Sequence, residues 1–216
     1  MQVVPLIMKK TLVLVILFVF PVVAYLFFAS GVNNFGRLPV LTEGVSDIGS
    51  LDAGQTLKGK ISILGFLGRD VGMKKGNAFN LNQKIYKHFY EFNDFQIVMV
   101  LPDGTQEPAA GLKKELGNLV DVGNWKFVFG TDRQVQELFD SLGTNLQLDG
   151  SLATPYVFIV DKDLSLRGRR KDEDEGVKFG FDTSSVADLN NKMVDDVKII
   201  LAEYRLALKK NNADRE

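Results

Sequence analysis

Cysteine is absent from the 216 residues of this chain, and histidine and tryptophan each occur once, as His88 and Trp125. Without a thiol, the chain forms no disulfide, zinc–thiolate site or iron–sulfur cluster, and it cannot use a cysteine nucleophile. A single imidazole also excludes every metal site that needs two histidines, and any Ser-His-Asp system would depend on His88. We therefore expect no bound cofactor and no enzymatic activity.

An excess of charge of either sign is also missing. The chain has 26 lysines and arginines and 27 aspartates and glutamates, for a net charge of −1. Binding to nucleic acid normally requires a positively charged surface, so this balance argues against it. Nucleotide binding is not expected either, because the spacing of Gly65, Gly68, Gly72 and Gly76 fits neither common phosphate-binding glycine motif.

One long hydrophobic run occupies residues 11–30, where 17 of 20 residues are apolar. A bilayer core needs roughly 20 apolar residues in a helix, so the run predicts a transmembrane helix in contact with lipid. The alternative is a cleaved signal peptide, whose apolar core is shorter, about 7–15 residues. Phe27 and Phe28 also crowd the only cluster of small residues, 29–31, which favours an uncleaved anchor.

The charges on either side of this run predict its orientation. Lys9 and Lys10 precede it, and the next positive charge is Arg37. By the positive-inside rule, residues 1–10 form a short cytoplasmic terminus and the rest of the chain lies outside the cytoplasm. In a bacterium this predicts a single-pass protein of the inner membrane with a periplasmic domain. Residues 31–44, at the start of a stretch rich in glycine, asparagine and serine, are interpreted as a tether.

Strand and helix patterns alternate over residues 45–208 and predict one α/β domain, a mixed sheet flanked by helices. Thr131 is expected to cap one helix, and Val197 and Ile200 lie in the middle of an apolar stripe on the last. Residues 209–216 are expected to form a polar tail. The expected strands are 61–66, 95–101, 125–129 and 154–160, and the expected helices are 77–92, 108–118, 132–142 and 186–208.

Three segments give this domain a resemblance to a known family. In residues 125–135 an aromatic strand leads through a glycine into a helix, residues 160–164 form an aspartate-centred hairpin, and residues 179–182 precede the last helix. Together they resemble the Sco (SenC) family. The resemblance covers roughly residues 45–208 and implies a thioredoxin-like fold.

The chain departs from this family at the copper site. Sco proteins bind copper through two cysteines in the loop after the first buried strand and a histidine before the hairpin. The resemblance places the two thiol positions near Arg69 and Met73, and the histidine position near Ala153. An arginine is no metal ligand, and a lone thioether is a weak one. The family's copper delivery and thiol–disulfide exchange are therefore not expected in this chain.

Two smaller features each have two interpretations. Met73 and His88, with a third residue such as Met99, could hold copper(I); otherwise they are a gap-filling methionine and a half-exposed histidine. Thr154 and Pro155 resemble the cis-proline loop of thioredoxins, which could face an extended peptide; otherwise they form a structural turn.

A charged segment also has two interpretations. Residues 167–171 hold four positive charges, directly followed by four negative charges at residues 172–175. Such a segment is a solvated loop whose halves screen each other, or a docking loop for a charged partner.

The resemblance and the missing ligands together favour a non-catalytic function. We expect a scaffold or accessory factor in the assembly of envelope proteins or of a respiratory copper oxidase. Its partner would be an envelope protein that the sequence does not identify. Two alternatives stay open: a copper chaperone with methionine and histidine ligands, and an enzyme whose site needs no thiol.

Overall fold

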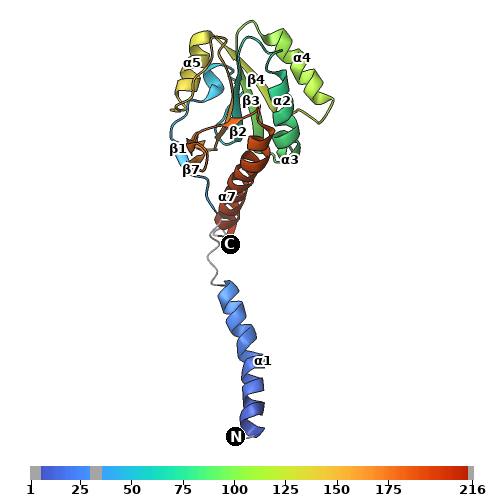
Figure 1. Ribbon diagram of the computed structural model, residues 1–216, viewed down its shortest axis with the longest axis vertical. Coiled ribbons are helices and arrows are strands. Elements are labelled where there is room, and N and C mark those ends of the chain that lie inside the picture. The colour runs from blue at the N-terminus through green and yellow to red at the C-terminus, as the bar shows by residue number, and fades with distance from the viewer. Residues whose placement is uncertain (1–5, 30–35, 214–216) are drawn as a thin grey trace. The chain divides into compact units, whose positions relative to one another are not determined.

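The computed structural model describes residues 6–29 and 36–213 (Figure 1). These residues belong to two units, one ending at Gly36 and one beginning at Arg37. The first unit is a single helix, α1 (Leu6–Ala29), with Pro21 inside it. Among the described residues no helix has the length and apolar character needed to cross a bilayer, so the predicted transmembrane span has no support from the structure. Position 30 of that span lies outside the described residues.

The second unit is built on a seven-stranded sheet with the order β1-β6-β5-β2-β3-β4, to which β9 adds beside β5. Strands β2, β3 and β4 are parallel neighbours, and β5 runs antiparallel to β2. This confirms the predicted mixed α/β sheet flanked by helices. The strands are β1 (Val40–Thr42), β2 (Ile61–Leu67), β3 (Phe95–Pro102), β4 (Trp125–Gly130), β5 (Ala153–Val160), β6 (Leu166–Arg167) and β9 (Phe181–Asp182).

Helices cover both faces of the sheet, and each face has its own apolar cluster (Figure 1). Ile63 and Ile97 belong to one cluster, and Leu64 and Val98 to the other. Because β2 and β3 are buried on both faces, their sequences are continuous apolar runs instead of alternating ones. The first face is covered by α2 (Lys75–Leu81), the π-helical turn η2 (Asn82–Tyr86), α3 (Lys87–Phe89), α4 (Gln106–Gly117) and α7 (Val194–Ala213), and the second by the 3₁₀ turn η1 (Ile48–Ser50) and α5 (Asp132–Asp140).

Two predicted helix features are confirmed. Thr131 caps α5 in a reciprocal capping box with Gln134, which satisfies two backbone N–H groups at the start of the helix. The last helical segment begins with α6 (Val186–Asp188) and the π-helical turn η3 (Leu189–Met193) before α7. Val197 and Ile200 of α7 are fully buried in the cluster that contains Val157 and Ile159 of β5.

Both ends of the domain differ from the prediction. The tether was expected to reach residue 44, but Leu38 is buried in the core and β1 pairs with β6. A strand of three half-buried residues has no alternating pattern, so the sequence does not reveal it. Residues 31–35 of the predicted tether lie outside the described residues. The polar tail was expected from residue 209, but α7 continues to Ala213.

Candidate functional site

The loop after β2 lies directly against the loop before β5. Gly68 has a φ of +66°, and a Cβ atom on it would lie 2.5 Å from the carbonyl oxygen of Ser151 and 2.7 Å from the Cβ of Ala153. The Arg69 N–H donates to the same Ser151 carbonyl over 2.9 Å. Arg69 and Ala153, the positions matched to one thiol and to the histidine of the Sco site, are therefore neighbours at this end of the sheet.

Charged groups occupy this end of the sheet, which we call the loop pole (residues 68–74, 132 and 149–154). Arg69 forms an ion pair with Asp132 in the first turn of α5. Lys74 lies 3.6 Å from Asp149. The Ser151 hydroxyl, which donates to Asp149 over 2.6 Å, and the backbone N–H groups of Ala153 and Ser151 hold the pKa of Asp149 below its usual range. Such a network fixes the two loops but supplies no soft metal ligand.

Met73, His88 and Met99 do not share a site. Met73 is 84% exposed just before α2, whereas His88 is an exposed residue of α3 at the far end of the same helical stretch. At 1.5 Å per helical residue, roughly 20 Å of helix separates them. Met99 is buried in β3, with its sulfur packed against Gly65. No group of three histidine or acidic side chains among residues 6–29 and 36–213 is arranged to hold a metal ion.

Thr154 and Pro155 belong to β5 and form no separate loop. The cis bond that the resemblance to the thioredoxin loop would imply is not found, since no cis peptide bond occurs in the described ranges. The Pro155 carbonyl already accepts hydrogen bonds from the Thr183 N–H at 2.9 Å and the Thr183 hydroxyl at 2.6 Å. That carbonyl is therefore satisfied within the domain and is not free to pair with an extended peptide.

The charged segment at residues 167–175 is not the solvated loop that its composition favoured. It supplies β7 (Arg169–Asp172) of a second, two-stranded sheet and the turn that leads to the other strand, β8 (Gly176–Lys178). Arg167 is only 5% exposed, and it donates to Asp161 over 2.9 Å, to Glu203 over 2.6 Å and to the Leu38 carbonyl over 2.7 Å.

Two further ion pairs attach this hairpin to the last helical segment. Arg169 lies 2.8 Å from the buried carboxylate of Asp196, and Lys192 lies 2.6 Å from that of Asp172. Burial raises the pKa of Asp196 even though Arg169 is beside it. For Asp172, burial acts to raise the pKa, but the hydrogen bonds from Lys192 and the Asp174 N–H and the charges of Lys192 and Lys178 together outweigh it, so the pKa is lowered. Arg169 and Asp172 therefore attach the hairpin to the rest of the fold, because the partner of each lies in the last helical segment.

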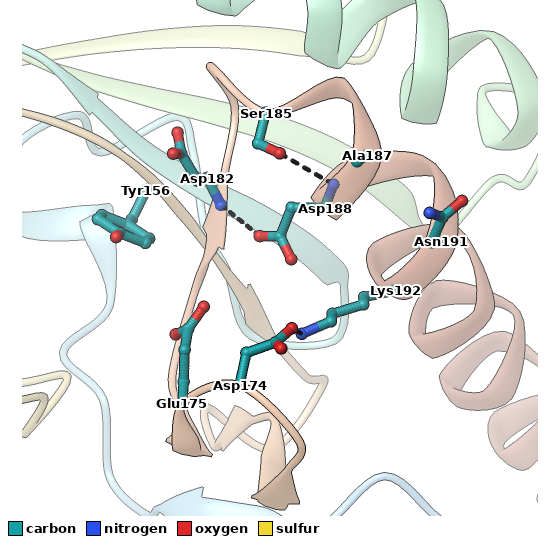
Figure 2. Close-up of a pocket in the computed structure, with 9 residues that line it drawn as sticks. All are labelled: Tyr156, Asp174, Glu175, Asp182, Ser185, Ala187, Asp188, Asn191 and Lys192. Carbon is teal, nitrogen blue, oxygen red and sulfur yellow. Dashed lines mark hydrogen bonds and ion pairs between the residues drawn. The ribbon is translucent and has the colours of Figure 1, made fainter.

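A hollow of about 340 Å³ lies between this hairpin and the start of the last helical segment (Figure 2). We call it the acidic hollow. Lys178 is fully buried, with its ammonium 2.6 Å from Glu175 and 3.1 Å from Asp188 in the wall. Burial and the charges of Asp182 and Glu175 raise the pKa of Tyr156. The lining residues are Tyr156, Asp174, Glu175, Asp182, Ser185, Ala187, Asp188, Asn191 and Lys192.

Most charges of the acidic hollow are already engaged inside the domain. Figure 2 shows Lys192 reaching Asp174, and the carboxylate of Asp188 accepting the backbone N–H of Asp182. No histidine or cysteine is among the residues that line it. The sequence did not reveal this hollow, although the acidic run at residues 172–175 was its one visible signal.

Comparison with known proteins gives likenesses of fold only. No family model matches the chain, and no curated protein matches it. Among solved structures, the BsSco protein of the Sco family of cytochrome c oxidase assembly proteins is 14% identical with a TM-score of 0.46, over 74% of this chain and 95% of that one.

Two other structures are similar to a comparable degree. A SCO1/SenC family lipoprotein from Bacillus anthracis is 14% identical with a TM-score of 0.45, over 78% of this chain and 98% of that one. The thioredoxin domain of a thiol-disulfide oxidoreductase from Bacteroides vulgatus is 17% identical with a TM-score of 0.41, over 77% of this chain and 96% of that one. At such identities and TM-scores, these proteins say nothing about what this chain binds or catalyses.

Proposed function

We propose that this protein is a Sco-like thioredoxin-fold domain without thiol or copper chemistry. It acts as a non-catalytic scaffold or accessory factor in the assembly of envelope proteins or of a respiratory oxidase. The observation that supports this proposal most is the loop pole. There, a salt-bridged arginine and a buried alanine stand at positions that the resemblance assigns to copper ligands.

The chemistry of these residues supports the loss of both Sco activities. The guanidinium of Arg69 is permanently charged, donates only, and repels a metal cation. Ala153 has no donor atom and is 1% exposed, so even a bound metal would find no ligand there. Thiol–disulfide exchange begins with attack by a thiolate, and the chain has no cysteine to supply one.

Anchoring in the membrane is part of the proposal and rests on the sequence. Residues 11–30 hold the hydrophobic run, and the lysines before it favour a cytoplasmic amino terminus. The domain from Arg37 onward would then lie outside the cytoplasm, on the periplasmic face of the inner membrane in a bacterium. An envelope protein is the corresponding class of partner.

A copper(I) titration of the full chain in detergent tests the chemistry. The chain should compete with a chromogenic copper(I) chelator no better than an unstructured peptide with the same methionines. A stoichiometric, tight complex that disappears in Met73→Leu or His88→Ala would instead establish the copper-chaperone alternative. In the same preparation, insulin reduction should be absent.

Deleting the gene in the source organism tests the role in assembly. The amount of assembled copper oxidase should fall, and added copper should not restore it, because the scaffold supplies no metal. Rescue by copper alone would overturn the scaffold proposal, and so would an oxidase and envelope proteome that are unchanged by the deletion.

A further inference from the structure

Strand β4 ends the sheet with one unpaired edge. It pairs with β3 alone, in unbroken register from Ile97 opposite Trp125 to Pro102 opposite Gly130. The carbonyls of Asn124 and Gly130 accept from N–H groups of the β3 side, so the even-numbered residues of β4 direct their backbone groups toward β3. Successive residues of a strand point their backbone groups to opposite edges. The odd-numbered residues therefore face away from the sheet.

Two of these outward residues have free backbone groups. Trp125 donates to the Val122 carbonyl over 3.0 Å, whereas Phe127 and Phe129 have no backbone partner in the described part of the chain. Both rings pack, half-buried, on the apolar cluster under α4. Natural sheets usually protect such an edge with a charged side chain, often lysine, or with a proline, a bulge or a covering segment, and β4 carries one such charge, Lys126. The paired stretch of β4 has no proline and no register shift.

Two lysines lie beside this edge, and Asp121 lies in the turn that leads into β4. Lys126 lies on β4 itself, and its ammonium donates only to the Gly123 carbonyl, over 3.0 Å. Partial burial, and to a smaller extent the charge of Lys126, lowers the pKa of Lys113 on α4. Neither lysine has a carboxylate within 4.0 Å among the residues that the structure describes. Two uncompensated ammonium groups beside a free strand edge favour an acidic occupant.

We propose that the free edge of β4 binds an extended acidic segment of a partner protein as an additional strand. The Phe127 and Phe129 backbone groups would hydrogen-bond to the segment, and its carboxylates would meet Lys113 and Lys126. This inference rests on the proposed scaffold function, whose partner it describes.

Peptide binding to the full chain in detergent micelles tests the edge. The probe is a short, fluorescently labelled peptide of alternating glutamate and valine, and its control has lysine in place of glutamate. We expect the acidic peptide to bind at least about tenfold more tightly than the basic one. The double variant Lys113→Glu, Lys126→Glu should invert that preference. Equal binding of both peptides, or of neither, would overturn the proposal.

Hydrogen exchange locates the bound peptide on the domain. The amides of Phe127 and Phe129 should become protected when the acidic peptide is added, whereas the amide of Val128, already paired with β3, should not change. Protection confined to any other surface would refute the edge site, whatever the affinity.

A pair of substitutions separates the contribution of the Phe127 backbone N–H to peptide binding from that of its side chain. Phe127→Val and Phe127→Pro both remove the ring, but only proline removes the outward N–H, which an edge strand tolerates. We expect Phe127→Pro to weaken peptide binding at least about tenfold relative to Phe127→Val, with both folded by circular dichroism. If the proline variant does not fold, the Lys113→Glu, Lys126→Glu variant and the hydrogen-exchange pattern still show whether the peptide binds at this edge.

The two proposals fail in different ways. If the peptide does not bind but deletion of the gene still lowers the oxidase, only the edge site is wrong. If the peptide binds but deletion leaves the oxidase and the envelope proteins unchanged, the scaffold function is wrong and the edge remains a peptide-binding surface.

Discussion

Ile200→Ala tests whether the last helix is part of the core. Ile200 is fully buried in the cluster that also contains Val157 and Ile159. The substitution removes three carbon atoms, whose transfer to water corresponds to about 2.4 kcal/mol. The cavity left behind relaxes only in part and brings the expected loss of unfolding free energy to about 3–4 kcal/mol.

Denaturant titration followed by tryptophan fluorescence measures this loss. Trp125 is the only tryptophan and lies fully buried in the same cluster, so its emission reports on the domain alone. Lys198→Ala is the matched control on the exposed side of α7. Its ion pair with Asp195 spans 3.1 Å between side chains that are each 61% exposed, so its loss should cost under about 0.5 kcal/mol. Small and equal losses for the two variants would show that α7 is not packed on the sheet.

Three further predictions concern the ion pairs and the orientation of the chain. Arg167→Ala leaves the buried Asp161 without its partner and should cost about 3–5 kcal/mol of unfolding free energy, whereas Arg133→Ala, on the exposed surface, should leave it almost unchanged; denaturant titration compares them. The hydrogen bond from Lys162 lowers the pKa of Asp94, so this carboxylate stabilises the fold fully above about pH 4, and the gain is lost as the pH falls through the folded-state pKa. Asp94→Asn should therefore make stability fall less steeply below about pH 4, and an unchanged slope would refute that linkage. A reporter that works only outside the cytoplasm should be active when fused after Glu216, and activity of a cytoplasmic reporter at the same site would reverse the predicted topology.

Local patterns were enough to predict the central elements. The continuous apolar runs of β2 and β3 and the capping sequence at Thr131 each depend on neighbours in sequence. The buried stripe of the last helix was visible for the same reason, because its spacing follows the helical repeat. One strand that was not predicted, β1, is short and is held by a partner far away in the sequence. β1 has three half-buried residues and is held by pairing with a strand more than a hundred residues later.

The site depends still more on distant partners. Arg69 was singled out by position in a resemblance, but its partner Asp132 lies 63 residues away, and nothing in either local sequence announces the pair. Arg167 stands in a run of charges that composition assigns to solvent, whereas its partner Glu203 is 36 residues away in α7. A charge pattern shows how many charged side chains a segment carries. Whether a basic side chain is buried depends on which carboxylates the fold places beside it.

Arg167 also determines how the domain would bear tension. Its guanidinium joins the first residues of the domain, through the Leu38 carbonyl, to the last helix, through Glu203. A pull on the chain at Arg37 would therefore load β1, Arg167 and Arg170, which donates to the Val40 carbonyl over 3.1 Å, before it reached β2 or β3. With only two register pairs to β6, β1 would peel away first and lengthen the tether while the central sheet stayed folded. The segment through which the chain enters the domain would thus unfold under tension before the central sheet does.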